Sequence, residues 1–202
     1  MAIHPPPAVV SDETDMFTAR DLWRMSVDQY HQMIDAGILT TDDRVELIEG
    51  WLVETLPKNP PHTATTDMIH YFLETMLPDG WIVRSQDSIT LKDSEQEPDI
   101  ALVKGIRREF FVRHPHPAEI ALLIEVADSS LKFDKGRKKR MYATAGIPIY
   151  GVLSLAERQL YVYSNPTNSD YQETVTYGEN DEMPIVIDGE ARGKLSLKSI
   201  LP

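Results

Sequence analysis

The sequence predicts an α/β (α+β) protein in which one mixed β-sheet is flanked by helices. Apolar residues at three- and four-residue spacings indicate helices in the N-terminal half and again near residue 140. Short runs of β-branched and aromatic residues lie between and after them, as is typical of strands. One run, residues 120–124, is apolar throughout and predicts a central strand buried on both faces. Helices and strands interleaved in this order favour a single mixed sheet.

The first 16 residues differ in composition from the rest. Residues 1–16 contain prolines and acids without periodicity, which predicts a loose N-terminal tail. Neither a repeat nor a linker-like stretch divides the remainder. We therefore expect residues 17–202 to form a single domain.

A helix and a hairpin are predicted next. Ser26 and Gln29 have the spacing of a capping box, so a helix is expected over residues 27–36, with Gly37 ending it. Two β-prone runs within residues 44–54 flank a Glu-Gly pair, which predicts a β-hairpin.

The middle of the chain alternates between helix and strand signals. Apolar residues form one stripe over residues 63–77, which predicts a second helix that ends before Pro78. Strands are predicted over three later segments, at residues 81–91, 98–103 and 120–126.

The C-terminal third begins with a helix and continues with strands. A helix is predicted over residues 134–145, with Gly146 as its cap. Short strands are expected after it, at residues 149–153, 159–163 and 171–177. The last stretch, residues 195–201, alternates only weakly.

Charge and composition limit the function classes. The 202 residues include no cysteine and carry a formal net charge of −12, which disfavours disulfides, thiolate metal sites and whole-surface binding to nucleic acid. The chain lacks a secretory signal and a long apolar run, so we expect a cytoplasmic protein without membrane contact. Basic residues concentrate in residues 132–140. These residues would either bind a polyanion locally or form a solvated helix face.

Two acids stand where strands should be buried. Asp99 follows a proline at the start of one apolar strand, and Glu125 lies near the end of another. A buried carboxylate is costly unless it is paired, hydrogen-bonded or metal-bound. On neighbouring strands, the two side chains would hold a hard divalent cation that activates water for attack on a phosphoryl group. Each acid taken alone is equally compatible with a structural role.

A lysine on the following helix is a candidate catalytic residue. Asp134, Lys138 and Tyr142 are spaced four residues apart and share one helix face. Lys138 would then project towards Glu125, where its ammonium would orient water or neutralise charge on a phosphate. Alternatively, Asp134 and Lys138 form an ordinary exposed helix pair.

The segment from Ile124 to Pro148 closely resembles the Uma-two family of restriction-endonuclease-like proteins, a branch of the PD-(D/E)XK nuclease superfamily. It reads Ile-Glu-Val-Ala-Asp-Ser-Ser-Leu, then Phe-Asp-Lys-Gly-Arg-Lys, Tyr-Ala and Ala-Gly-Ile-Pro. Residues 44–50 and 97–101 match other blocks of the family, and the resemblance extends from about Arg20 to Leu201.

The resemblance implies a restriction-endonuclease-like core and a metal-dependent endonuclease acting on DNA. Asp99 and Glu125 would be the metal-binding acids, with Glu46 as a further metal ligand. The metal would be Mg²⁺, with Mn²⁺ as a substitute. Lys138 would be a catalytic lysine that has moved onto the helix, because Ala127 occupies the superfamily's usual lysine position.

Further residues follow from the same reasoning. The basic residues Arg137, Lys139 and Arg140 would contact DNA phosphates. His62 matches a recurrent histidine, which we expect to cap the second helix. Gly151 replaces the family's usual tryptophan, which affects packing.

Other functions are compatible with these residues. The acidic net charge and the displaced lysine also suit a catalytically inactive nuclease-fold protein that binds nucleic acid or a protein partner. A carboxylate-pair hydrolase acting on sugars is a weaker alternative. A homodimer is compatible with double-strand cleavage, although no residue requires one.

Overall fold

The computed structural model describes residues 22–202, so the tail predicted over residues 1–16 lies outside the described residues. The helices are α1 (Val27–Asp35), α2 (Pro60–Glu74), α3 (Leu131–Phe133), α4 (Lys139–Thr144) and α5 (Leu197–Ile200). A π-helical turn, Asp134–Lys138, joins α3 to α4, and 3₁₀ turns occupy Arg107–Phe111 and Pro117–Glu119.

The strands are β1 (Val45–Ile48), β2 (Trp51–Glu54), β3 (Trp81–Arg84), β4 (Ile89–Thr90), β5 (Glu95–Gln96), β6 (Ile100–Lys104), β7 (Ile120–Ala127), β8 (Ile149–Ser154), β9 (Gln159–Pro166), β10 (Tyr171–Gly178), β11 (Glu182–Ile187) and β12 (Glu190–Ser196).

A six-stranded sheet forms the centre of the molecule. Its strand order is β10-β9-β8-β7-β6-β3, and β7 with β8 is its parallel pair, the other neighbours being antiparallel. The chain reaches β8 from β7 through α3, the π-helical turn and α4, as a parallel connection requires a crossover. The mixed sheet predicted from the sequence is therefore confirmed.

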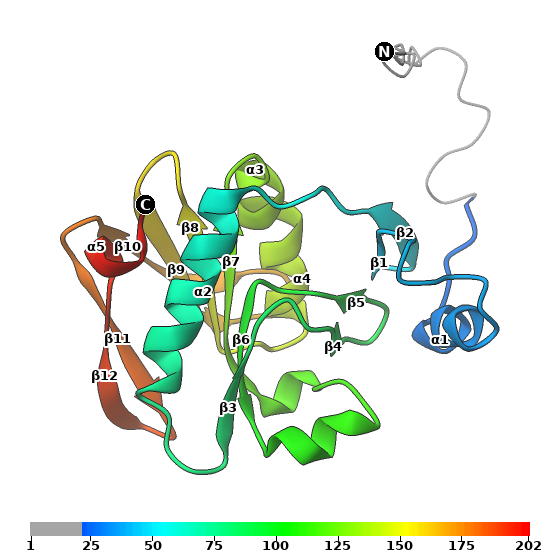
Figure 1. Cartoon of the computed structure of the whole chain (residues 1–202), viewed down its shortest axis with the longest axis horizontal. Helices are drawn as coiled ribbons and strands as arrows, with labels where there is room; N and C mark the ends of the chain where they lie inside the picture. The colour runs from blue at the N-terminus through cyan, green and yellow to red at the C-terminus, as the bar shows by residue number, and fades with distance from the viewer. Residues whose placement is uncertain (1–21) are drawn as a thin grey trace.

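Two apolar layers cover the faces of this sheet. One layer contains Ile69 and Leu73 of α2 together with the apolar side chains of β11, β12 and α5. The other contains Met141 and Tyr142 of α4. In Figure 1, α2 crosses the near face of the sheet, and the β11–β12 hairpin stands beside it. Alternating residues of β6 and β7 enter opposite layers, so each strand is buried on both faces.

A smaller sheet with the order β2-β1-β5-β4 adjoins the central one. The predicted hairpin of residues 44–54 forms its β1–β2 pair. Its turn residues Glu49 and Gly50 both have positive φ, at 49° and 82°, as a type I′ hairpin turn requires. In Figure 1 these strands and α1 extend to the right of the central sheet.

The predicted boundaries of two helices were wrong. The helix expected over residues 63–77 is α2, which begins at Pro60 because Asn59 caps it and prolines are tolerated in a first turn. The helix expected from residue 134 begins at Leu131 and contains the π-helical turn.

Two strand predictions were also incomplete. The strand expected over residues 81–91 is two strands, interrupted where Gln86 adopts a positive φ of 56°. The weakly alternating end of the chain is part of a hairpin, β11–β12, followed by α5. Among residues 22–202, no helix has both the length and the apolar composition to span a membrane.

Candidate active site

Asp99 and Glu125 lie side by side on one face of the central sheet. The register pairs Ile100 of β6 with Ile124 of β7, so the next residues outward on each strand, Asp99 and Glu125, stand opposite each other. The alternation along the strands places Asp99 on the face of Ala101, and Glu125 on the face of Leu123, which is the α4 side. The exposed fractions are 4% for Asp99 and 3% for Glu125.

Asp99 is held by three neighbours. Its Oδ2 lies 3.0 Å from Nε2 of His62 and accepts a hydrogen bond of 2.9 Å from the backbone N–H of Val126. Its Oδ1 lies 3.6 Å from Nζ of Lys58. Burial by itself would raise the pKa of Asp99, but His62, the Val126 amide and Lys58 together outweigh it and lower that pKa. Asp99 is therefore an ionised carboxylate.

Glu125 is held by α4 and the turn before it. Its Oε1 lies 2.8 Å from Nζ of Lys138 and accepts a hydrogen bond of 3.0 Å from the hydroxyl of Tyr142. Burial raises the pKa of Glu125 to about 8, with Lys138 opposing that rise and the nearby Asp99 and Asp134 adding to it. The two neighbouring acids therefore differ in their readiness to ionise.

Asp134 is a third buried acid at this position. Its Oδ2 accepts a hydrogen bond from the hydroxyl of Ser130, and its Oδ1 lies 3.8 Å from Nζ of Lys138. The alternative of an exposed helix pair would leave Asp134 at the surface, but only 2% of it is exposed. Burial raises its pKa, although Lys138 and Ser130 oppose the rise. Asp134 and Lys138 therefore form a largely buried pair, and the alternative of an exposed helix pair is wrong.

The three acids border one cavity of about 410 Å³. Glu46 of β1 also lines it, and burial raises the pKa of this carboxyl as well. The segment 55–59, which connects β2 to α2, lines another side. The charged and imidazole side chains around the cavity are Glu46, Glu54, Lys58, His62, Glu97, Asp99, Glu125, Asp128, Asp134 and Lys138.

The basic residues predicted to contact phosphate are not brought to this cavity. Nε of Arg137 lies 2.7 Å from Oε2 of Glu49, at the tip of the β1–β2 hairpin. Nζ of Lys139 lies 2.8 Å from Oδ1 of Asp170. Arg140 is exposed and borders a second cavity beside α4. Of the basic segment 132–140, Lys138 is the cation that lines the cavity of the acids.

Sequence reasoning missed the role of two residues. The expectation that His62 caps the second helix was wrong: Asn59 is the cap, and its side chain accepts the backbone N–H of His62. The imidazole of His62 instead contacts the carboxylate of Asp99. Lys58 was not considered, because a lone lysine between prolines gives no periodic signal. Only the fold brings residues 58 and 62 to the end of β6.

The donor set has the chemistry of a site for a hard cation. Glu46, Asp99 and Glu125 offer carboxylate oxygens to one cavity, and Mg²⁺ commonly takes one or two carboxylates while keeping waters. Burial is the main cause of the raised pKa of Glu125, and the nearby Asp99 and Asp134 add to it; a divalent cation beside the carboxyl would favour its ionised form. Within residues 22–202, however, no three acid or histidine side chains are spaced closely enough to enclose an ion by themselves. A bound ion would thus depend on waters for part of its shell.

A mixed sheet carrying paired acids on adjacent strands defines the restriction-endonuclease-like class. A family model described as "Uma2: Putative restriction endonuclease" matches residues 27–190, and the chain belongs to this family. The resemblance inferred from the sequence is therefore confirmed.

A structural neighbour with the same fold has been solved. It is the crystal structure of "a putative nuclease belonging to DUF820" from Anabaena variabilis ATCC 29413. The two chains share 19% sequence identity and superpose with a TM-score of 0.64, over 87% of this chain and 97% of that one. At this identity the likeness shows the fold alone. No curated protein matches this chain.

Proposed function

We propose that this protein is an endonuclease that hydrolyses phosphodiester bonds of DNA with the help of a divalent metal ion. The observation that carries the proposal is the acid pair, Asp99 and Glu125, opposite each other on adjacent strands with the ammonium of Lys138 at 2.8 Å from Glu125. Membership of the Uma2 family supports the same reaction class.

Asp99 and Glu125 would hold the metal, which we propose to be Mg²⁺ with Mn²⁺ as a substitute, and Glu46, which lines the same cavity, would bind it through a water. A bound divalent ion supplies Lewis acidity and lowers the pKa of a bound water. The remaining chemistry belongs to the side chains. Tyr142 and His62 fix the rotamers of Glu125 and Asp99, which keeps both carboxylates aimed at the cavity.

Lys138 would stabilise developing negative charge. Burial would lower the pKa of Lys138, but Glu125, Asp134 and Glu46 outweigh it and raise that pKa, so the amine stays protonated. A cation fixed in a water-poor cavity stabilises a phosphorane-like oxygen without reorganising during the reaction. Lys138 is therefore proposed as the catalytic lysine.

Substitution of the three residues tests this function. We expect Asp99→Asn, Glu125→Gln and Lys138→Met each to lower the rate of DNA cleavage by about a hundredfold or more. The measurement is cleavage of single-stranded and double-stranded DNA with Mg²⁺ or Mn²⁺, before and after chelation by EDTA. Asp188→Asn, an exposed acid paired with Lys104, is the matched control and should keep full activity. Cleavage that survives intact in Asp99→Asn would reject the assignment.

One observation favours the alternative of a catalytically inactive nuclease-fold protein. Both acids already have basic partners, His62 and Lys58 for Asp99 and Lys138 for Glu125. Calorimetric titration with Mn²⁺ separates the two functions. Saturable binding that disappears in Glu125→Gln supports the nuclease, whereas no binding at millimolar metal supports the inactive protein.

A further inference from the structure

The buried acids are covered by the segment of residues 55–59. Lys58 of this segment contacts Asp99, and Nδ2 of Asn59 donates a 2.7 Å hydrogen bond to Oδ2 of Asp128, just beyond β7. The segment is therefore fastened to the two strands that carry the acids. A substrate phosphate that meets Asp99 and Glu125 in this cavity would therefore lie close to the segment, which lines the cavity.

Apolar side chains line the same cavity as the acids. Leu56 of the 55–59 segment is 77% exposed, although leucine is usually buried. Phe133, at the end of α3, is half-buried and lines the cavity as well. A cavity of about 410 Å³ lies within the range that takes a small organic group. Aromatic and apolar walls of this kind accept the flat face of a nucleobase.

The cations of the cavity differ in accessibility. The side chain of Lys58 is 35% exposed, against 13% for Lys138. A phosphate that enters from solvent meets the more accessible ammonium first, and Lys58 lies next to Asp99. Lys58 thus has the position of a phosphate-binding residue, between the apolar wall and the acids.

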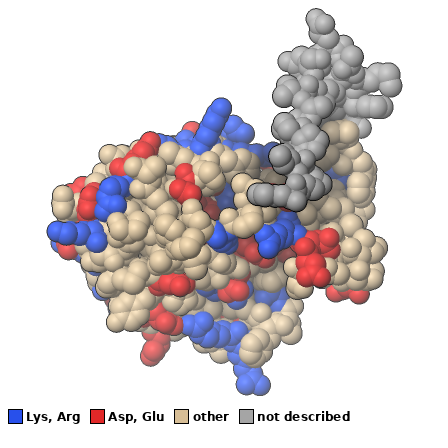
Figure 2. Space-filling view, turned by 45° about the horizontal axis from the view of Figure 1, so that its top comes forward, with Lys and Arg blue, Asp and Glu red and all other residues tan. Residues whose placement is uncertain are grey.

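The surface of residues 22–202 is poorly suited to binding a DNA duplex. Tight binding of a duplex takes many phosphate contacts, yet the chain carries a net charge of −12. Many of its surface cations are paired with acids, among them Lys104, Arg107, Arg113, Arg158 and Lys194. Figure 2 shows acidic and basic side chains interspersed over the visible face.

We propose that the cavity takes one unstacked nucleotide of a flexible single DNA strand, with its phosphate at Lys58 and its base against Leu56 and Phe133. A stacked duplex keeps its bases inside and is stiff over about 150 base pairs, so it presents phosphates only at its own surface. A single strand turns a nucleotide out at little cost. This inference rests on the proposed function for its substrate class, and it assigns single strands and unpaired ends as the preferred substrates.

Binding measurements test the inference separately from catalysis. The probe is a fluorescently labelled oligothymidylate of about ten residues, free or annealed to oligoadenylate, with the full chain in Ca²⁺. By fluorescence anisotropy we expect the single strand to bind about tenfold more tightly than the duplex. Leu56→Ala and Phe133→Leu should each weaken single-strand binding about tenfold, because the first loses apolar contact with the base and the second loses the stacked ring. Leu56 is exposed, so its substitution leaves the core intact.

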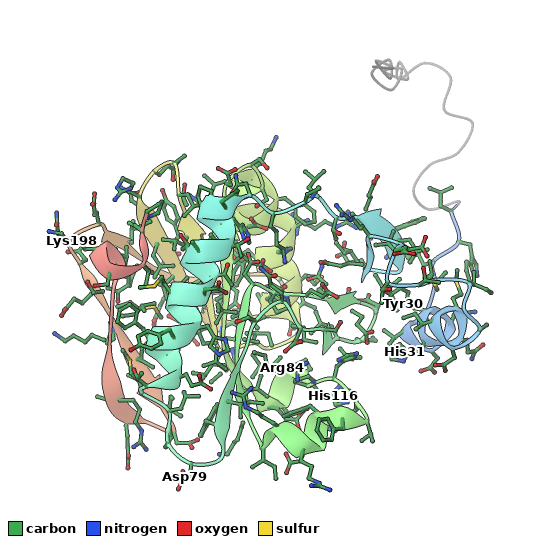
Figure 3. The ribbon with its side chains drawn as sticks, in the orientation of Figure 1. Tyr30, His31, Asp79, Arg84, His116 and Lys198 are labelled. Carbon is green, nitrogen blue, oxygen red and sulfur yellow. The ribbon has the colours of Figure 1, made fainter. Side chains whose placement is uncertain are left out.

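Lys58→Ala has a distinct signature. The slope of log affinity against log salt should become shallower by about 0.7 to 1, because one phosphate contact is lost. The matched controls, Phe111→Ala (81% exposed) and Lys198→Ala, should bind as the unmodified protein does. Lys198 lies on α5, at the left edge of Figure 3.

Each outcome decides one question. The inference is wrong if the duplex binds as tightly as the single strand. It is also wrong if neither Leu56→Ala nor Phe133→Leu weakens single-strand binding. With Mn²⁺ in place of Ca²⁺, cleavage of the duplex at least as fast as the single strand also overturns it, while leaving the nuclease assignment intact. Single-strand binding as expected without any cleavage supports the inference and rejects the nuclease assignment.

Discussion

Two adjacent carboxylates in this protein are held in different electrostatic states by different neighbours. Asp99 receives an imidazole, a backbone amide and an ammonium, and its pKa is lowered. Glu125 is buried more completely by the packing around α4, and its pKa is raised. Basic partners therefore compensate the charge of Asp99, whereas Glu125 keeps its proton to a higher pH. The same balance makes the site sensitive to pH and to cations.

The raised pKa of Glu125 predicts a pH dependence of stability in the metal-free protein. In the unfolded chain this group titrates near its ordinary value of 4.5, and in the folded protein near 8. Between these values the folded state holds the additional proton, so stability is full below about pH 4.5 and falls as pH rises towards 8. The fall is at most about 1.4 kcal/mol per pH unit.

Urea unfolding in EDTA at several pH values measures this dependence. Glu125→Gln removes the titrating group, so the variant should lose less stability between pH 5 and pH 8 than the unmodified protein. Parallel curves for the two proteins would show instead that Lys138 keeps Glu125 ionised throughout this range.

At the scale of elements, the site depends on strand register and on an irregular helix. The β6–β7 register sets Asp99 opposite Glu125, and a shift of one residue would move either acid to the other face. The π-helical turn Asp134–Lys138 carries one acid and the lysine, and Tyr142 follows one turn later. Such π-helical turns are frequent at functional sites, because they redirect side chains that a regular helix would place elsewhere.

Gly136 in this turn gives a prediction about stability. An added Cβ would have no atom within 4 Å, and its φ is not in the left-handed region. We expect Gly136→Ala to raise the free energy of unfolding by about 0.5–1 kcal/mol, because alanine loses less conformational freedom on folding. Thermal and urea unfolding measure the change.

Gly151→Ala is the contrasting variant. A Cβ on Gly151 of β8 would lie 3.3 Å from Ile124 Cγ1 and 3.3 Å from Leu160 Cδ1, so this change should be neutral or destabilising. If Gly151→Ala stabilised the protein and Gly136→Ala destabilised it, the predicted difference in space around the two glycines would be wrong.

At the scale of the whole molecule, the C-terminal end completes the core. Leu195 and Leu197 are fully buried and Ile200 is 2% exposed, all in the apolar layer that contains α2. The family model ends at residue 190, before these side chains. The apolar face of α2 therefore depends on a part of the chain that lies beyond the family match.

Truncation after residue 190 should unfold the protein. Losing the burial of each of the three side chains costs about 1.5–3 kcal/mol, and their sum is comparable to the whole stability of a domain. Thermal unfolding followed by near-ultraviolet circular dichroism should show no cooperative transition for residues 1–190. Deletion of Pro202 alone, which is exposed, is the control and should change little. If the truncated protein melted within a few degrees of the full chain, α5 and β12 would not be needed to complete the core.

The amino-acid pattern was enough to predict the mixed sheet, the first hairpin, the central strand β7, and Asp99, Glu125 and Lys138 as candidate site residues. These follow from local causes, because hydrophobic periodicity and an acid within an apolar run are properties of neighbouring residues. The family resemblance rested on the same contiguous residues around Glu125.

The surroundings of those residues could not be predicted from local pattern, because they depend on how distant segments pack. His62 and Lys58 lie about forty residues before Asp99 in the chain, yet the fold brings both to its carboxylate. Arg137, on the π-helical turn, instead pairs with Glu49 at the tip of the β1–β2 hairpin. The physical reason is that ion pairs, burial and pKa values depend on distances between distant segments, which packing fixes and local pattern does not.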